Sequence, residues 1–380
     1  MAVYDYNSLE EKYNGFLNPV ADVKSNGKSI GKSSDEIVVS DVRVELTSGY
    51  EASEALFSVY NCFDREKGRF VTDSLRNYIS LGSQITVEAG YDTAINNIFT
   101  GYVSKVDFVY GQNEIPHIDV FCMDIKGVMM AGNHECQLTS KNYGDSVREI
   151  FQKSIYQKMK SKGIYNELNI TSTPDKGKEN KGESDRTIEM TGESDYEFVV
   201  RAAKRFNYEF FADCGSVMFR KARTSDSALI SLNTFKGIRE VRVEYDMAGL
   251  VENILVRGMD YGKSELITAK KKLNNNISLG NRAKQIISGS EKICIDSWIK
   301  SREDADYRLA RAEEETSFGF GTVRISCIGL PEIKPGSYMK IEDMGEPVSN
   351  KFYVTQVHHI IDDERGYVTI IIGKTDRINS

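Results

Sequence analysis

The sequence predicts a mainly β protein with an α+β middle piece, in which two similar small antiparallel β-barrels are joined by a helix-plus-hairpin domain. Three observations support this fold class. Alternating apolar residues fill two long blocks, at residues 37–135 and 236–380, as expected of strands that bury one face. A capped amphipathic helix followed by a hairpin lies between the blocks. The two blocks also resemble each other in sequence, which indicates an internal duplication.

The middle piece is predicted from the residues around position 200. Ser194 and Glu197 form a capping box, in which each side chain can satisfy an unpaired backbone N–H of the first helical turn. Residues 208–210 and 217–219, separated by a turn at 213–216, then predict a β-hairpin. The helix should have an apolar face, Phe198, Ala202 and Phe206, and a basic face, Arg201, Lys204 and Arg205.

The strands of the two blocks are short and are separated by glycine-containing turns, as is typical of a small antiparallel barrel or sandwich. The predicted strands of the first block are 37–39, 42–46, 55–59, 82–91, 98–106 and 118–124. Those of the second block are 241–245, 254–256, 323–327, 335–341, 352–359 and 367–373. Two more helices are predicted, at 145–160 with Val147, Phe151, Ile155 and Met159 on one face, and at 301–315 behind a Ser301–Asp304 cap.

The two blocks share a spaced motif. Each half reads as strand, turn and strand, followed by a third run rich in β-branched residues, so both blocks are expected to be copies of one barrel. Three such chains would supply six quasi-equivalent barrels, which lets a three-fold object meet a six-fold one. The matching motifs are Gly82-Ser83-x-Ile85-x-Val87 with Phe99-x-Gly101-Tyr102-Val103-x-x-Val106, and Gly336-Ser337-x-Met339-x-Ile341 with Phe352-Tyr353-Val354-x-x-Val357.

The chain of 380 residues is long enough for two or three domains, each with its own core. The expected division is an N-terminal arm at 1–36, a first barrel at 37–135, a central α/β domain at 136–235, and a second barrel at 236–380 with a polar insertion at about 261–291. The net charge of -7 argues against nucleic acid as the main partner, although a local basic patch remains open. No signal peptide and no membrane span is predicted, so synthesis and folding are expected in the cytoplasm.

No residue pattern predicts a catalytic, cofactor-binding or metal site, and the chain is not expected to be an enzyme. His358 and His359 are neighbours in a predicted strand and point to opposite faces, so they cannot readily chelate one metal ion. His117 and His134 stand apart from them in the sequence. No Gly-x-Ser-x-Gly elbow occurs, and nothing marks two opposed carboxylates. The six cysteines form no CxxC pair and are expected to be free, buried thiols.

Several motifs in this order resemble the baseplate hub proteins of contractile tails, which include the phage late-control D proteins and the N-terminal half of VgrG spike proteins. The resemblance covers about residues 37–377. In the first block it rests on the run from Gly82-Ser83 through Val103 to Asp124. Elsewhere the motifs are Ser194-Asp195-Tyr196-Glu197-Phe198, the 210–219 hairpin, Leu330-Pro331-x-x-x-Pro335-Gly336, Tyr353-Val354-x-x-Val357-x-His359 and Gly366-Tyr367-Val368-Thr369.

This resemblance implies a homotrimeric hub, whose two barrels per chain form a pseudo-hexameric ring that joins a six-fold tail tube to a three-fold spike. The implied partners are the tail tube protein, a separate spike protein, since no spike follows the second barrel, and baseplate wedge or tape-measure proteins. Docking is expected at the strand tips and at 261–291. The chain would assemble in the bacterial cytoplasm and end in the baseplate of a phage, a bacteriocin-like tail or an injection system. A tail-associated peptidoglycan hydrolase and a secreted carbohydrate-binding β protein remain as alternatives.

Overall fold

The computed structural model describes residues 3–31, 37–71, 75–140, 142–175, 188–225, 227–273 and 281–378. The protein is mainly β, and its largest sheet has 13 strands. These strands are β1 (Pro19–Ser25), β2 (Lys28–Ser29), β3 (Val38–Thr47), β4 (Glu54–Tyr60), β7 (Gln84–Tyr91), β8 (Ala94–Gly111), β9 (Glu114–Met123), β15 (Ala228–Leu232), β16 (Ile238–Tyr245), β20 (Gly321–Ile328), β21 (Tyr338–Ile341), β22 (Lys351–Asp362) and β23 (Gly366–Thr375).

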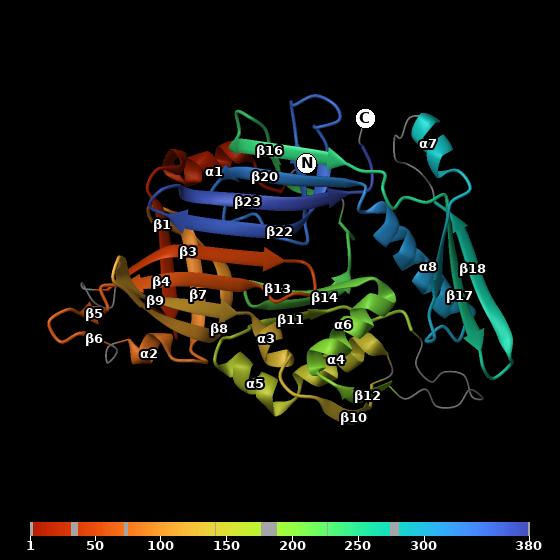
Figure 1. Cartoon of the computed structure of the whole chain (residues 1–380), viewed down its shortest axis with the longest axis horizontal. Coiled ribbons are helices and arrows are strands. Elements are labelled where there is room, and N and C mark those ends of the chain that lie inside the picture. Colours follow the sequence, from red (N-terminus) through yellow and green to blue (C-terminus); the bar gives the residue numbers. More distant parts are fainter. Residues whose placement is uncertain are drawn as a thin grey trace.

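The strand order in this sheet is β16-β20-β23-β22-β3-β4-β9-β8-β7-β1-β2, with β21 placed between β22 and β15. Figure 1 shows β16, β20, β23, β22, β3 and β4 as roughly aligned bands, one below another, with β1 and β7 running steeply across them. β1 also contacts β22 and β23, so the sheet curls back over itself. Every neighbouring pair is antiparallel except β15 with β21.

The two sequence blocks share this one sheet, and the described residues form no closed barrel, which differs from the expectation of two separate barrels. The reason is the length of β22. Its first residues, 351–353, pair with β21, and residues 356–361 pair with β3 of the first block. The sheet therefore continues from one block into the other, and buried residues of both blocks form a single apolar core.

The N-terminal segment, expected to be an arm, is built into this core. It contains α1 (Tyr6–Lys12), the short 3-10 helix η1 (Asn14–Phe16) and β1, which pairs with β7 along its whole length. Tyr13 is fully buried, and its hydroxyl donates a hydrogen bond to Glu332 Oε1 at 2.5 Å. The rings of Tyr13 and Phe16 each lie 5.4 Å from that of Tyr91 in β7, so this segment contributes to the main core.

The central unit contains the predicted capped helix and hairpin, and both predictions are confirmed. Its elements are α3 (Ile125–Met129), β10 (His134–Leu138), α4 (Tyr143–Phe151), α5 (Ser154–Ser161), β11 (Glu167–Ile170), β12 (Ile188–Glu193), α6 (Asp195–Phe206), β13 (Tyr208–Asp213) and β14 (Ser216–Lys221). The Ser194 hydroxyl accepts from the Glu197 N–H at 3.2 Å, and the Glu197 carboxylate accepts from the Ser194 N–H at 2.7 Å. Phe198 and Ala202 are fully buried, as expected for the apolar face.

The single helix predicted at 145–160 is instead two helices, α4 and α5. Lys153 has a non-helical backbone, with φ -56° and ψ 143°, which breaks the helical hydrogen bonding between them. The break changes which side chain faces inward: Tyr156 is buried, whereas Ile155 is 45% exposed. The Tyr156 hydroxyl donates to Asp195 Oδ2 at 2.6 Å at the start of α6. This polar contact, invisible to apolar spacing, favours the shifted register.

A separate unit interrupts the second block between β16 and β20. It contains β17 (Asn253–Asp260), β18 (Glu265–Lys272), α7 (Asn281–Ile287), β19 (Glu291–Ile295) and α8 (Arg302–Ser317). β17 pairs with β18 and β19 in a separate sheet, and α8 packs against it over a small core of its own (Figure 1). This unit, which we call the excursion, spans residues 246–320 and is longer than the insertion expected at 261–291. The prediction assigned the strand at 254–256 to the second barrel, because an apolar pattern does not show which sheet a strand joins. Residues 274–280 lie outside the described part of the chain.

The remaining elements lie beside β8. They are β5 (Phe63–Asp64), β6 (Arg69–Phe70) and α2 (Arg76–Ile79). β5 and β6 form a short hairpin, and the ring of Phe70 lies 5.3 Å from that of Phe108 in β8. The Ser301 cap of α8 is present as predicted, since its hydroxyl accepts from the Asp304 N–H at 3.1 Å.

Candidate functional site

In the first half of the sheet, which comprises β3, β4, β7, β8 and β9, a Gly-Ser pair and one serine hydroxyl hold a bulge in β8. The Gly82 N–H donates to the Val103 carbonyl and the Val103 N–H donates to the Ser83 carbonyl, both at 2.9 Å. Ser104 follows at a break in the register between β8 and β9, and its hydroxyl donates to the Phe121 carbonyl at 3.1 Å. A bulge of this kind bends a strand and increases its twist. β8 pairs with β7 before the bulge and continues without it afterwards.

The second half repeats this arrangement in β22. The Gly336 N–H donates to the Val354 carbonyl at 2.9 Å, and the Val354 N–H donates to the Ser337 carbonyl at 2.8 Å. Thr355 occupies the register break between β22 and β23, and its hydroxyl donates to the Ile372 carbonyl at 3.1 Å. The motifs that suggested a duplication in the sequence therefore hold the same backbone geometry twice.

The equivalence extends to whole strands. In order, β3, β4, β9, β8 and β7 of the first half correspond to β16, β20, β23, β22 and β21 of the second. Matching rows across three strands are Arg43–Leu56–Phe121 in the first half and Arg242–Arg324–Ile372 in the second. β3 and β16 also have similar sequences, which the shared motifs of the two blocks did not include. The two runs are Asp41-Val42-Arg43-Val44-Glu45-Leu46 and Glu240-Val241-Arg242-Val243-Glu244-Tyr245.

The two halves meet at one pair of strands, β3 with β22, which we call the internal seam. Glu45 lies opposite His358, and Val44 lies opposite His359. Val44 and His359 are fully buried on the inner side. On the other side, His358 Nδ1 lies 3.3 Å from Glu45 Oε1. The seam therefore has a buried inner row, in which Val44 faces the polar His359, and a polar outer row.

His359 is a buried polar residue within the seam. Its Nδ1 lies 3.0 Å from the Tyr367 hydroxyl and 3.2 Å from the Thr369 hydroxyl. Burial is the main cause that lowers the pKa of His359 from its ordinary 6.5 to about 3, and the nearby His358 and Lys334 act in the same direction. The imidazole is therefore neutral in the folded protein at neutral pH.

Two edges of the sheet are equivalent to the strands of the seam but lack a strand partner within the described ranges. We call them the free edges: residues 105–110 of β8 on the side away from β9, and β16 on the side away from β20. Figure 1 shows β16 at the upper end of the stacked strands and β8 at the lower end. Phe108, the equivalent of buried His359, is 53% exposed, and Tyr110 is 65% exposed.

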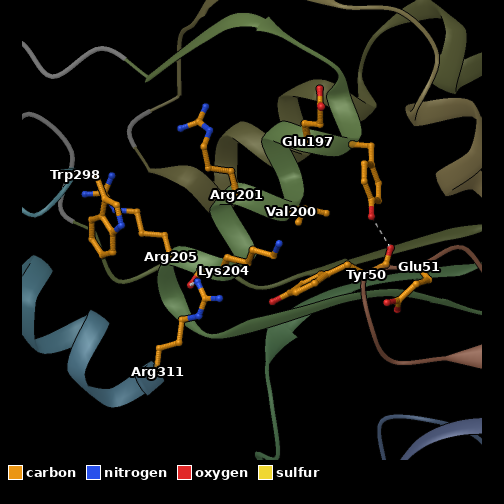
Figure 2. A pocket seen from close by; sticks show the side chains of 10 residues that line it. Tyr50, Glu51, Glu197, Val200, Arg201, Lys204, Arg205, Trp298 and Arg311 are labelled. Atoms are coloured by element: carbon orange, nitrogen blue, oxygen red, sulfur yellow. Dashed lines mark hydrogen bonds between the residues drawn. The ribbon is translucent and has the colours of Figure 1, made fainter. Parts of the chain in front are cut away.

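A pocket of about 580 Å³ lies between α6, α8 and the turn after β3. Figure 2 shows that the basic face of α6 points into it, with Tyr50 and Trp298 on either side. Lys204 Nζ lies 5.3 Å from the centre of the Tyr50 ring, and the Arg205 guanidinium lies 4.8 Å from that of Trp298. Such contacts are favourable because the ring face carries a partial negative charge.

The guanidinium groups in this pocket have protein partners. Arg201 pairs with Glu193, and Arg205 Nη2 lies 2.7 Å from Asp304 Oδ1. Arg311 pairs with a carboxylate of its own helix and donates to the Lys204 carbonyl. Each arginine of the pocket therefore has a carboxylate partner, and the contacts of Arg205 with Asp304 and of Arg311 with the Lys204 carbonyl join the central unit to the excursion.

The structure keeps the four histidines apart. His117 Nε2 lies 3.6 Å from Asp119 Oδ1 and His134 Nε2 lies 3.8 Å from Asp195 Oδ2, while His358 and His359 lie on opposite sides of β22. In the part of the chain that the structure describes, no group of three or more His, Cys, Asp or Glu side chains is placed to hold a metal ion. The described helices include none that is both long and apolar enough to cross a membrane.

The family model described as the Alg8 N-terminal domain matches residues 20–363. A comparison with curated proteins finds no match to the sequence. Among solved structures, the chain is similar to a tail protein from Neisseria meningitidis MC58, with a TM-score of 0.67 at 11% identity, covering 95% of this chain and 97% of that chain.

Two further structures have related folds. The 43 kDa tail protein of prophage MuSo2 from Shewanella oneidensis gives a TM-score of 0.67 at 13% identity, over 94% of this chain and 99% of that chain. An Escherichia coli component of the type VI secretion system gives 0.52 at 9% identity, over 92% of this chain and 76% of that chain. At these identities the likeness concerns the fold alone, and it confirms a fold shared with phage tail and type VI secretion proteins.

Proposed function

The chain belongs to the family of the Alg8 N-terminal domain, and from this premise we propose that it is the structural hub of a tail baseplate. Its fold is that of phage tail proteins. In this proposal three copies form a ring that joins a six-fold tail tube to a three-fold spike. The particle is a contractile phage tail or a related injection system, and the chain assembles in the bacterial cytoplasm before it joins the baseplate.

The observation that carries this proposal is the repetition within one chain. The same strand order, the same Gly-Ser pair and the same hydroxyl-bearing bulge occur twice. A chain with two equivalent halves can occupy two equivalent positions in a ring, and three such chains supply six. The two β-barrels that the sequence predicts correspond in this proposal to the two halves of the open sheet.

The proposal divides the chain by these halves. The first unit takes residues 37–123, and the second takes 236–245 with 321–375. The central unit at 124–225 and the excursion at 246–320 then stand outside the ring-forming sheet. This division differs from the expected one mainly by separating the excursion from the second barrel.

The proposed partners are further copies of the chain, the tail tube protein, a separate spike protein, and wedge or tape-measure proteins. The excursion supports a docking role for the region around 261–291, because its sheet exposes apolar side chains. Leu266 is 67% exposed and Ile295 is 73% exposed. Exposed apolar patches on soluble proteins commonly mark interaction sites.

The proposed role is not enzymatic. A peptidoglycan hydrolase needs two opposed carboxylates, one of them protonated. Burial raises the pKa of Asp124 and of Glu209, but each carboxylate is engaged locally. Asp124 accepts from the N–H groups of Ser53 and Lys126, both at 2.8 Å, and Glu209 accepts from the Tyr353 hydroxyl. Glu209 Oε2 also lies 3.5 Å from Arg220 Nε, so both carboxylates are held by neighbouring groups of the protein.

The test is the solution mass of the purified full chain, measured by native mass spectrometry alone and after addition of its tube protein. A trimer, alone or formed with the tube protein, is the expected result. A chain that stays monomeric and binds neither tube nor spike protein would overturn the hub assignment. Release of soluble fragments from purified cell wall would instead favour the hydrolase.

A further inference from the structure

We propose that the pocket between α6, α8 and the turn after β3 binds a peptide segment that presents one carboxylate beside an aromatic or branched apolar side chain. The inference goes beyond the proposed function, because it assigns a ligand class to a pocket formed mainly by the central unit and the excursion. It does not depend on whether the chain forms a ring.

The pocket is large enough for such a segment. Its volume of about 580 Å³ lies within the range of about 300–1,000 Å³ that is usual for ligand pockets. The lining side chains come from the turn after β3, from the basic face of α6, and from two places in the excursion, Trp298 and Arg311. Because these belong to the first half of the sheet, the central unit and the excursion, a bound segment would contact all three.

The surface of the pocket is basic. Four of the lining residues are cations, Arg201, Lys204, Arg205 and Arg311, and two are carboxylates. The carboxylates that pair with the three arginines are not among the lining residues. Of the two that are, Glu197 is engaged in the cap of α6, where it accepts from the N–H and the hydroxyl of the preceding cap residue. A ligand in the pocket therefore meets mainly positive charge.

Lys204 is the cation that can receive a carboxylate. Its side chain is exposed, and the described residues place no carboxylate within ion-pair distance of its Nζ. A ligand carboxylate that reaches this Nζ would form a charge-assisted hydrogen bond. Arg205 Nε adds a second donor, since it is buried without a hydrogen-bond partner among the described residues. Leaving a buried donor unpaired is costly, so an acceptor that reaches it would be stabilising.

Two aromatic rings, Tyr50 and Trp298, supply the apolar part of the site (Figure 2). Tyr50 is held at both ends: its hydroxyl donates to the Tyr208 carbonyl at 3.2 Å, and its carbonyl accepts from the Tyr196 hydroxyl at 3.0 Å. The Arg205 guanidinium lies 4.8 Å from the centre of the Trp298 ring. Rings that are fixed before binding can bury an apolar side chain with little further loss of conformational freedom.

Glu51 favours a ligand with a single carboxylate. It is the second carboxylate that lines the pocket, and Figure 2 shows it on the opposite side of the Tyr50 ring from Lys204. A polyanion such as nucleic acid would bring further negative charge toward Glu51, and like charges repel. A peptide whose carboxylate lies at Lys204 avoids this repulsion. The net charge of -7 disfavours nucleic acid for the same reason.

The test uses the single tryptophan of the chain as its reporter. Because Trp298 lines the pocket, the intrinsic fluorescence of the full chain reports on this site. Three N-acetylated dipeptides are titrated: leucyl-phenylalanine with a free C-terminal carboxylate, the same dipeptide as its amide, and aspartyl-phenylalanine amide. The first and third distinguish a chain end from an acidic side chain as the source of the carboxylate. Isothermal titration calorimetry measures the same affinities independently of fluorescence.

At least one carboxylate dipeptide should give a saturable fluorescence change and bind at least about tenfold tighter than the neutral leucyl-phenylalanine amide, because only a carboxylate can pair with Lys204. Lys204→Ala should weaken that binding about fivefold or more. The matched control Lys158→Ala, at an exposed lysine of α5, should bind as the parent does. Trp298→Phe should lose the fluorescence signal and still bind in calorimetry.

Three results would overturn the inference: equal binding of the acid and amide forms, an unchanged affinity in Lys204→Ala, or no binding of either carboxylate dipeptide. If an oligothymidylate binds where the dipeptides do not, the pocket takes nucleic acid and the proposed ligand class is wrong. The solution mass keeps this test apart from that of the hub, since a trimer can form without dipeptide binding and a monomer can still bind the dipeptide.

Discussion

The internal seam and the free edges are made from equivalent strands, yet the same positions meet different surroundings. Val44 is fully buried in the seam, whereas its equivalent Val243 is partly exposed. His359 is fully buried, whereas Phe108 is 53% exposed. The chain therefore has one contact between equivalent strands that is completed during folding, and a matching pair of edges that have no strand partner among the described residues. Substitutions at equivalent positions should separate stability from association.

The largest difference is expected for Val44→Asp and Val243→Asp. An unpaired carboxylate at the fully buried seam position should lower the free energy of unfolding by about 4 kcal/mol or more. At the β16 edge the carboxylate stays hydrated, so the loss should be about 1 kcal/mol. Urea unfolding measured by circular dichroism compares the two.

The association of these variants sharpens the same comparison. Val243→Asp should fold but lose self-association, whereas Phe235→Asp, at an exposed apolar residue outside both edges, should associate as the parent does. Equal losses of stability at Val44 and Val243, or normal association of Val243→Asp, would contradict the distinction between a buried seam and a free edge.

The two Gly-Ser turns should respond unequally to alanine. Both glycines have positive φ, 81° at Gly82 and 77° at Gly336, which costs an alanine about 1–2 kcal/mol. A Cβ at Gly336 would also lie 2.7 Å from Phe211 Cζ, whereas no atom lies within 4 Å at Gly82. Gly336→Ala should therefore lose about 3 kcal/mol and Gly82→Ala about 1 kcal/mol. Thermal unfolding of both variants measures this, and a larger effect at Gly82 would argue against the packing described.

The seam should also make stability depend on pH. His359 has its pKa lowered to about 3 in the folded protein, against 6.5 when unfolded. The unfolded state therefore binds the extra proton between these values, and stability falls as the pH drops below 6.5. From pH 7.5 to pH 5 the loss should be about 2 kcal/mol. His359→Gln should remove this component, and an unchanged difference between the two pH values in urea titrations would refute it.

The smallest effects are expected at the two bulge hydroxyls. Ser104→Ala and Thr355→Val each remove one hydrogen bond to a strand carbonyl, at 3.1 Å in both halves. Each should cost about 1 kcal/mol, because a lost neutral hydrogen bond has roughly that net value. Losses that agree within error would support the equivalence of the two halves, whereas a loss in only one would limit it to backbone shape.

Local signals in the sequence predicted much of this structure. The capping box at Ser194, the hairpin after it and the Gly-Ser echo each depend on residues close in the chain, and each was found where expected. The family resemblance extended these signals to a fold shared with phage tail proteins, although the described residues do not form the two closed barrels that it implied.

The sequence did not predict which strands pair when they lie far apart in the chain. Alternation predicted a strand at 254–256 but not that it joins β18 and β19 instead of the large sheet. The length of β22 was visible, but its use by two partners, β21 and β3, depends on where the chain returns in space. The free edges required the structure, although the repeated Val-Arg-Val-Glu run in β3 and β16 was available in the sequence.

The most direct test of the account is a single-particle reconstruction of the full chain assembled with its tube protein. The account predicts three chains and six equivalent sheet units around one axis. A ring in which the two halves of each chain take unequal positions, or one built from another number of chains, would contradict it.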